Sequence, residues 1–124
     1  MAFDAGTGGP EPNSKYEVIG TGEVITRTGG NIPDEFTAEI SNTPGTLSMA
    51  NTGAPNSGGS QFFINVVHND FLDFFNQRTP SKHPVFGKVA SDDDLKFIQD
   101  IVSVDTRQDK PITPIVMESI TIDE

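Results

Sequence analysis

Residues 45–51 (GTLSMAN) and 60–67 (SQFFINVV) decide the fold. Both are short runs of apolar and small side chains, a pattern typical of strands that bury at least one face. Between them, residues 52–59 (TGAPNSGG) are dominated by residue types that form turns. A third run of the same kind is 85–89 (VFGKV). These segments predict a mainly β domain built from short strands.

Further strands are expected on both sides of this centre. Residues 16–28 (YEVIGTGEVITRT) place apolar side chains among polar ones around Gly20-Thr21-Gly22, which predicts a hairpin. Residues 115–122 (IVMESITI) alternate well enough to predict a closing strand, and the polar residues 103–114 before them predict a loop. Short strands with one helix favour a barrel or a sandwich.

The one clear helix is predicted near residues 91–102. Ser91 is a good N-cap, and Asp92–Asp94 place negative charge at the positive end of the helix dipole. The apolar side chains that follow recur at helical spacing and form one stripe: Leu95, Ile98 and Val102.

Composition excludes several classes of function. The 124 residues predict a single domain, 1–124, and the formal net charge of −10 with only 8 Lys and Arg argues against a nucleic-acid binder. There is no apolar run near the ~18 residues of a membrane span, and the first residues lack the pattern of a secretory signal, so a cytoplasmic location is expected. The sequence has no cysteine, and His68 and His83 lack zinc-site spacing, so neither a metal nor another cofactor is expected.

Two interpretations of the central segment remain open from the residues alone. Apolar strands there are mixed with amide side chains such as Asn51 and Gln61. The phenylalanines could be core residues, with the amides satisfying turns. Alternatively, aromatic side chains could line a groove in which a few amides hold a peptide.

Four motifs, in the same order, resemble those of the cyclophilin family. Residues 45–51 match G-x-L-S-M-A-N, 59–64 match G-S-Q-F-F-I, 71–73 match W/F/H-L-D, and 83–89 match H-x-V-F-G-x-V. Weaker matches are the GTGG loop at residues 6–9 and the D-E-F segment at residues 34–36. The resemblance implies an antiparallel barrel capped by helices, and peptidyl-prolyl cis-trans isomerase activity that assists protein folding.

The same resemblance assigns the site residues. Three are implied in catalysis: Gln61, Phe63 and His83. Seven are implied in substrate binding: Met49, Ala50, Asn51, Thr52, Ser60, Phe71 and Leu72.

In this assignment Phe63 and Leu72 line the proline pocket, with Met49 on its floor and His83 at its edge. Ala50 and Asn51 pair with the substrate backbone, and Thr52 and Ser60 border the neighbouring pocket. We further expect Phe62 to face the core.

Implied partners are proline-containing peptides and unfolded protein segments. Cyclosporin is a further implied ligand, weakened because Phe71 stands where many family members have Trp.

The sequence departs from the family pattern before the GTGG loop. The strands, helix and F-H-R motif that carry the family's catalytic arginine are not found, and none of Arg27, Arg78 and Arg107 lies in that context. We therefore expect a barrel that is incomplete at the N-terminus. Three explanations stay open: a fragment or truncation, a chain completed by another chain or by a homodimer partner, and a reduced protein whose hairpin at residues 16–28 replaces part of the sheet. A non-catalytic module that binds proline peptides is the alternative function.

Overall fold

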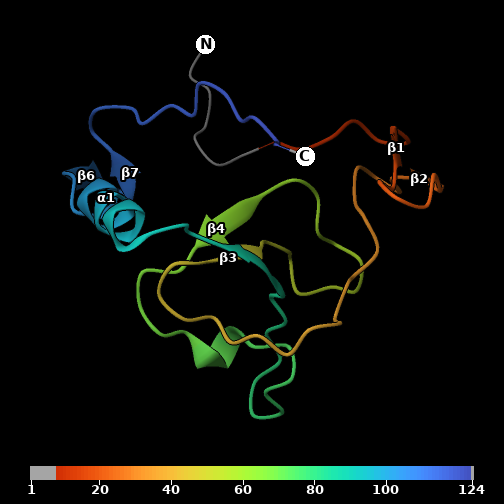
Figure 1. The fold of residues 1–124 in the computed structure, drawn as a ribbon, viewed down its shortest axis with the longest axis horizontal. Helices are drawn as coiled ribbons and strands as arrows, with labels where there is room; N and C mark the ends of the chain where they lie inside the picture. Colours follow the sequence, from red (N-terminus) through yellow and green to blue (C-terminus); the bar gives the residue numbers. More distant parts are fainter. Residues whose placement is uncertain (1–7, 124) are drawn as a thin grey trace.

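The computed structural model describes residues 8–123, which form a mainly β structure with one α-helix. The elements are β1 (Lys15–Glu17), β2 (Val24–Thr26), β3 (Thr46–Met49), β4 (Phe62–Ile64), the 3-10 helix η1 (Asp70–Leu72), β5 (Val85–Lys88), α1 (Asp92–Val102), β6 (Thr106–Arg107) and β7 (Lys110–Pro111). Figure 1 shows three separate antiparallel sheets, with β3 and β4 at the centre and α1 at one side. The expected barrel is not closed by the described residues.

The central sheet has the order β4–β3–β5, as the three motif strands predict. In its register Ser48 lies opposite both Phe63 and Val85, and Met49 lies opposite Phe62. Because paired residues share a face of a sheet, Ser48, Phe63 and Val85 face one side and Met49 and Phe62 face the other.

The first of these faces is closed by polar groups. Among the described residues, Val85 is the one buried apolar side chain, whereas the buried polar side chains are Asn42, Thr46, Ser48, Asn65 and Asp73. None of their buried nitrogen and oxygen atoms in this part of the chain is without a hydrogen-bond partner. Hydrogen bonds therefore hold the centre of this sheet where apolar packing would be expected.

The opposite face of the sheet is open. Phe62 is 36% exposed and Phe86 57% exposed, and their rings meet edge-on with centroids 6.3 Å apart. The expected core position of Phe62 is therefore wrong for this structure, because within the described residues no layer packs over this face closely enough to bury the ring.

Gly45 sets the start of β3. Its φ of +87° lies in the left-handed region, and a Cβ there would approach Val89 Cγ2 to 3.0 Å. Its N–H donates to the Asn65 carbonyl at 2.7 Å, and its own carbonyl accepts from Val89 N at 2.8 Å. Glycine is thus needed where β3 enters between its two neighbours.

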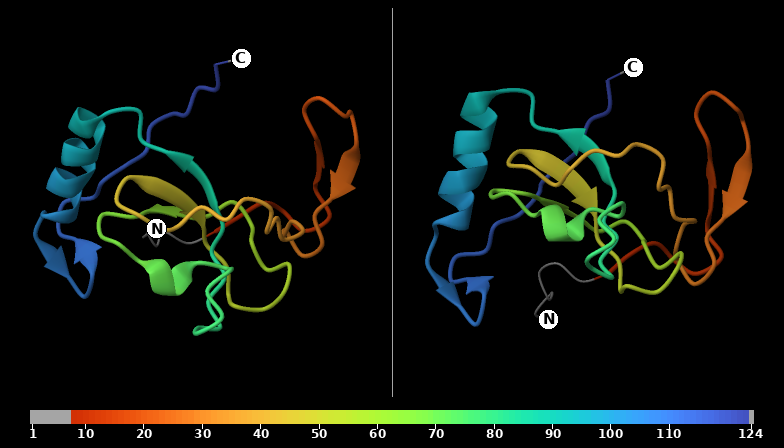
Figure 2. Two further views of the ribbon diagram at one scale, coloured as in Figure 1. Left: turned by 60° about the horizontal axis from the view of Figure 1, so that its bottom comes forward. Right: turned by 90° about the horizontal axis from the view of Figure 1, so that it is seen from below.

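The predicted hairpin at residues 16–28 is confirmed as β1 and β2, paired from Lys15–Thr26 to Glu17–Val24. Figure 2 shows it standing apart from the central sheet, at the end of the molecule away from α1. The Arg27 guanidinium lies 4.6 Å from the centroid of the Tyr16 ring and ties the strand ends together.

The predicted helix is confirmed with its cap. Ser91 Oγ accepts from Asp94 N at 3.1 Å and donates to Asp94 Oδ2 at 2.8 Å, so cap and third residue bond reciprocally. Leu95 and Ile98 are half-buried, whereas Val102 is 59% exposed and adds little to the packed stripe. No helix in the described residues is long and apolar enough to cross a membrane.

Replacing Ser91 with Ala is expected to lower the free energy of unfolding by about 1 kcal/mol, because the Asp94 N–H loses its partner. Chemical denaturation measures this difference. The control is Lys96→Ala, which removes the exposed ion pair to Asp100 at 3.2 Å and should cost about 0.5 kcal/mol or less. Equal losses in the two variants would contradict the capping role.

The C-terminal part differs from the prediction in two ways. The expected loop contains the β6–β7 hairpin, whose turn residues Gln108 and Asp109 both have positive φ, as a two-residue hairpin turn requires. The expected strand 115–122 is not formed. Its residues make no backbone hydrogen bond with any other described residue, and Val116 stays 72% exposed. Alternating apolar and polar residues predict that a segment has one apolar face, but a strand also needs a neighbouring strand to which its backbone can hydrogen-bond.

Candidate peptide-binding groove

An aromatic cluster lies beside the central sheet. Phe63 projects from β4, and its ring meets the His83 ring edge-on, with centroids 5.5 Å apart and planes at 75°. The backbone N–H of His83 donates to the backbone carbonyl of Leu72 at 2.9 Å, which fixes the loop that contains His83 against the end of η1. Phe71 precedes Leu72 and is 50% exposed. The structure thus brings the Phe63 and His83 rings into contact and ties the backbone of His83 to that of Leu72.

The orientation of the His83 ring is set by the backbone of β3. His83 Nδ1 lies 3.0 Å from the Met49 carbonyl oxygen. A carbonyl can only accept, so Nδ1 donates, and in the neutral ring Nε2 is the acceptor. The ring is therefore held at the edge of the cluster in one defined tautomer.

A polar cleft of 350 Å³ lies next to this cluster. Five of the predicted site residues line it: Ala50, Asn51, Thr52, Ser60 and Gln61. Gly8–Pro10 and Gly29–Asn31 form the opposite wall. Gln61 Nε2 donates to the Gly8 carbonyl at 2.7 Å and so bridges the two walls.

A second, open hollow of 590 Å³ continues from the polar cleft past Phe63. Both hollows include Gly8, Gly9, Ser60 and Gln61, so they form one groove. Met117 lines the second hollow, although sequence reasoning placed it only in a closing strand. One end of the groove is lined with amides and hydroxyls, and the other with aromatic and aliphatic side chains.

The side chain of Asn51 is already engaged. Its Nδ2 donates to the Lys82 carbonyl at 2.6 Å, and its Oδ1 accepts from Gly53 N at 2.9 Å. The carboxamide therefore ties two loops of the rim together. The backbone N–H and carbonyl of Asn51 bond to no other described residue, which leaves the backbone to contact a ligand.

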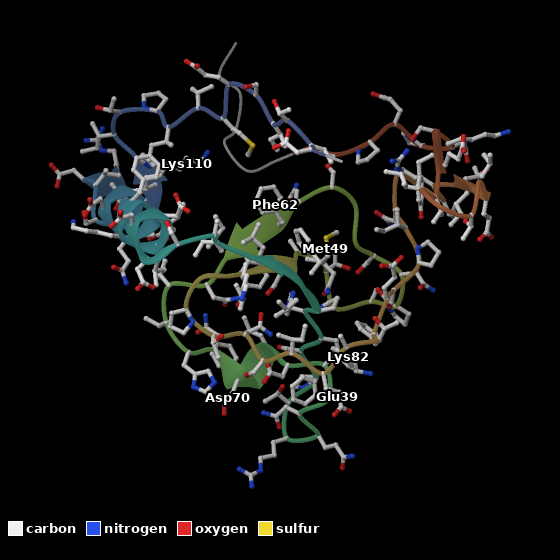
Figure 3. The ribbon with its side chains drawn as sticks, viewed as in Figure 1. Glu39, Met49, Phe62, Asp70, Lys82 and Lys110 are labelled. Atoms are coloured by element: carbon white, nitrogen blue, oxygen red, sulfur yellow. The ribbon has the colours of Figure 1, made fainter. Side chains whose placement is uncertain are left out.

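Met49 does not lie beneath Phe63. The register pairs it with Phe62 on the other face of the sheet, and Figure 3 shows both labelled side chains beside β3 and β4. Met49 lines another cleft of 360 Å³, together with Ile32–Glu35, Thr37 and Phe86. The expected floor position of Met49 is therefore wrong. Met49 lies on the face of the sheet opposite to that of Phe63, whereas its neighbour Ser48 lies on the Phe63 face.

Asp73 follows Leu72 and is the one buried charged residue in the described part of the chain, with 3% exposure. Burial raises the pKa of its carboxyl group. Hydrogen bonds from Ser41 and from the side chain and backbone of Asn42, with the nearby charge of His68, lower it, and the net pKa lies below the ordinary value. The sequence showed Asp73 only as part of a motif, without its role in the polar centre.

The three arginines lie away from the groove walls. Arg27 stacks on Tyr16 and donates to Ser14 Oγ at 3.2 Å, and Arg107 belongs to β6. Arg78 lies in the loop after η1, where its backbone N–H donates to Asn76 Oδ1 at 3.0 Å. Within the described residues, no arginine lines either hollow of the groove.

A groove that joins an aromatic pair to an amide-lined cleft is a candidate ligand site on a mainly β protein. The model of the family "Cyclophilin type peptidyl-prolyl cis-trans isomerase/CLD" matches residues 4–122. The chain therefore belongs to the cyclophilin-type peptidyl-prolyl cis-trans isomerase family.

Curated relatives agree with this assignment. Peptidyl-prolyl cis-trans isomerase B of Escherichia coli is 39% identical over 99 residues, covering 75% of this chain and 59% of the relative. An isomerase of Acinetobacter baylyi is 39% identical over 100 residues, covering 77% and 51%. Isomerase cypE of Dictyostelium discoideum is 42% identical over 88 residues, covering 70% and 50%. The chain spans about half the length of these relatives.

Proposed function

We propose that the chain binds proline-containing segments of peptides and unfolded proteins in this groove and catalyses rotation about the X–Pro bond. The observation that carries the proposal is the ring contact of Phe63 with His83, whose backbone is bonded to that of Leu72, beside a cleft lined by Asn51 and Gln61. The first group suits a proline ring, and the second suits the peptide backbone that precedes it.

The chemistry needs no proton transfer and no bond cleavage. Amide resonance gives the peptide bond a rotation barrier of about 18–20 kcal/mol. A site that grips the proline ring while the preceding carbonyl turns binds the twisted amide better than either planar form. In the proposed site Phe63 and Leu72 hold the ring, and donors along the amide-lined cleft, Gln61 among them, orient the chain.

The family barrel is part of the same proposal. The exposed apolar face with Met49, Phe62 and Phe86 supports the idea that the central sheet is one wall of an antiparallel barrel. A second copy or another polypeptide would cover that face. A melting temperature that rises with protein concentration supports a second copy, and one that does not change argues against it.

A specific observation favours a second candidate, a proline-peptide binding module without catalysis. The placement of Arg27, Arg78 and Arg107 puts no guanidinium in the groove formed by the described residues. A missing transition-state donor costs about 10²–10³ in rate and need not abolish binding. In either case cyclosporin should bind weakly, because Phe71 offers no indole N–H at the rim.

Exchange NMR on a proline-containing peptide tests the proposal. Faster cis–trans exchange in the presence of the chain supports catalysis. Peptide shift changes without faster exchange support the binding module. A folded chain that gives neither effect would overturn both candidates for this polypeptide.

A further inference from the structure

Asn42 is the centre of the buried polar network behind the groove. It is fully buried, and so are its hydrogen-bonded neighbours Ser48 and Asn65. Its Nδ2 donates to Asp73 Oδ1 at 2.8 Å and to the His83 carbonyl at 3.2 Å. Its Oδ1 accepts from Ser48 Oγ at 2.6 Å and from Asn65 Nδ2 at 3.1 Å. Both hydrogens and both lone pairs of the carboxamide are thus in use.

Three of these bonds reach residues that belong to the aromatic cluster or neighbour it. The His83 carbonyl belongs to the residue whose ring contacts Phe63. Asp73 directly follows Leu72. Ser48 lies opposite Phe63 in the sheet register. One planar group therefore connects the strand, the 3-10 helix and the loop that have to meet for the pocket to exist.

We propose that Asn42 is a positioning residue for the groove, a role that rests on the proposed function. A fully bonded carboxamide fixes both the distance and the angle between its partners, which apolar packing does less sharply. A side chain lacking the two donors leaves the His83 carbonyl and Asp73 without these bonds. Among the described residues, His83 is then held only by its bonds to the Met49 and Leu72 carbonyls, so the position of its ring against Phe63 is less sharply fixed. Asn42 contacts no substrate and acts through His83, Leu72 and Phe63.

Asn65 provides a matched control in the same network. It is 1% exposed, and its Nδ2 donates to Thr46 Oγ1 at 3.0 Å and to Ser48 Oγ at 3.2 Å. Its Oδ1 accepts from Asn69 Nδ2 at 2.8 Å. It makes no side-chain bond to residues 70–83 in the described part of the chain. Asn42→Ala and Asn65→Ala should therefore cost similar stability but differ in their effect on the groove.

The test compares these two variants in the full chain. NMR of the free proteins reads the His83 ring resonances, and titration with a proline-containing peptide gives affinity per folded molecule. We expect Asn42→Ala to move the His83 ring signals and to weaken peptide binding about tenfold more than Asn65→Ala does, roughly the effect of one lost hydrogen bond. Equal changes in both variants overturn the positioning role.

Two further readouts separate the proposals. If Asn42→Ala does not fold, the unmodified chain is titrated with peptide: the Asn42 side-chain amide signals should shift while those of Asn65 stay in place, and unmoved Asn42 signals at saturation overturn the role. If the unmodified chain binds no peptide, the proposed function fails. The His83 ring signals of the two free variants then still decide whether Asn42 positions this residue.

Discussion

Replacing Phe63 with Ala is expected to weaken binding of a proline-containing peptide about 10- to 100-fold, with a smaller effect on stability. The Phe63 ring is half-buried and meets His83 on the groove side of β4. Contact of a phenylalanine ring with an apolar ligand contributes roughly 1.5–3 kcal/mol, and about 1.4 kcal/mol corresponds to a tenfold change in affinity. Peptide titration followed by NMR measures the loss, and any acceleration of cis–trans exchange should disappear with it.

Phe62 is the natural control for this prediction. It neighbours Phe63 in sequence and has the same side chain, but it lies on the other face of β4, beside Met49 and Phe86. Phe62 also lines the open hollow, but its ring meets Phe86 instead of His83. Phe62→Ala should therefore weaken peptide binding less than Phe63→Ala does, by about twofold at most. A comparable loss of affinity in both variants would show that the groove uses the other face of the sheet.

Replacing Asp73 with Asn is expected to cause the largest loss of stability, about 3 kcal/mol or more. Asp73 Oδ1 accepts from both the backbone N–H and Nδ2 of Asn42 at 2.8 Å, and Oδ2 accepts from Ser41 Oγ at 2.6 Å. An amide nitrogen at the Oδ1 position faces two N–H donors that it cannot accept from, and at the Oδ2 position the Ser41 hydroxyl has to turn from donor to acceptor. In either orientation the bonds lose the charge of the carboxylate. A loss of this size is a large share of the 5–15 kcal/mol typical of folded domains, and chemical denaturation measures it.

The same carboxylate predicts a pH dependence. Its pKa in the folded state lies below the ordinary value of 3.8, so the folded state prefers the charged form more strongly than the unfolded state does. The resulting stabilisation is fully present at neutral pH and is lost as the pH falls below about 4, through the folded pKa. The stability gap between the unmodified chain and Asp73→Asn should therefore narrow in acid. A constant gap from pH 7 to pH 3 would show that the charge of Asp73 has no part in it.

Local sequence patterns predicted the elements that depend on near neighbours. Residues 45–51, 60–67 and 85–89 contain the three strands of the central sheet, and residues 91–102 contain the capped helix. The contact of Phe63 with His83 followed from the family motifs rather than from composition. Turn residues, caps and short apolar runs are encoded within a few positions of one another, so they can be predicted without knowing the tertiary structure.

The features that depend on long-range pairing could not be predicted in this way. Nothing near Asn42 in sequence announces that its carboxamide meets Asp73 and the His83 carbonyl. The alternating residues at 115–122 predicted an apolar face but could not show whether another strand pairs with the segment. The positions of Met49 and Phe62 depended on the register of the sheet and on which of its faces is covered. A buried polar side chain in a short strand, such as Ser48, was the one available signal of a polar centre.

The polar centre also has a thermal consequence. Unfolding raises the heat capacity in proportion to newly hydrated apolar surface, and exposure of polar groups lowers it. In this chain Asn42, Ser48, Asn65 and Asp73 are buried, while large apolar side chains such as Ile19, at 83% exposure, are already in water. The heat-capacity increment of unfolding should fall below the usual ~12–15 cal/mol/K per residue. The free energy of unfolding of this chain should then change only gradually with temperature. Cooling should lower it less than it lowers that of a protein with a large apolar core.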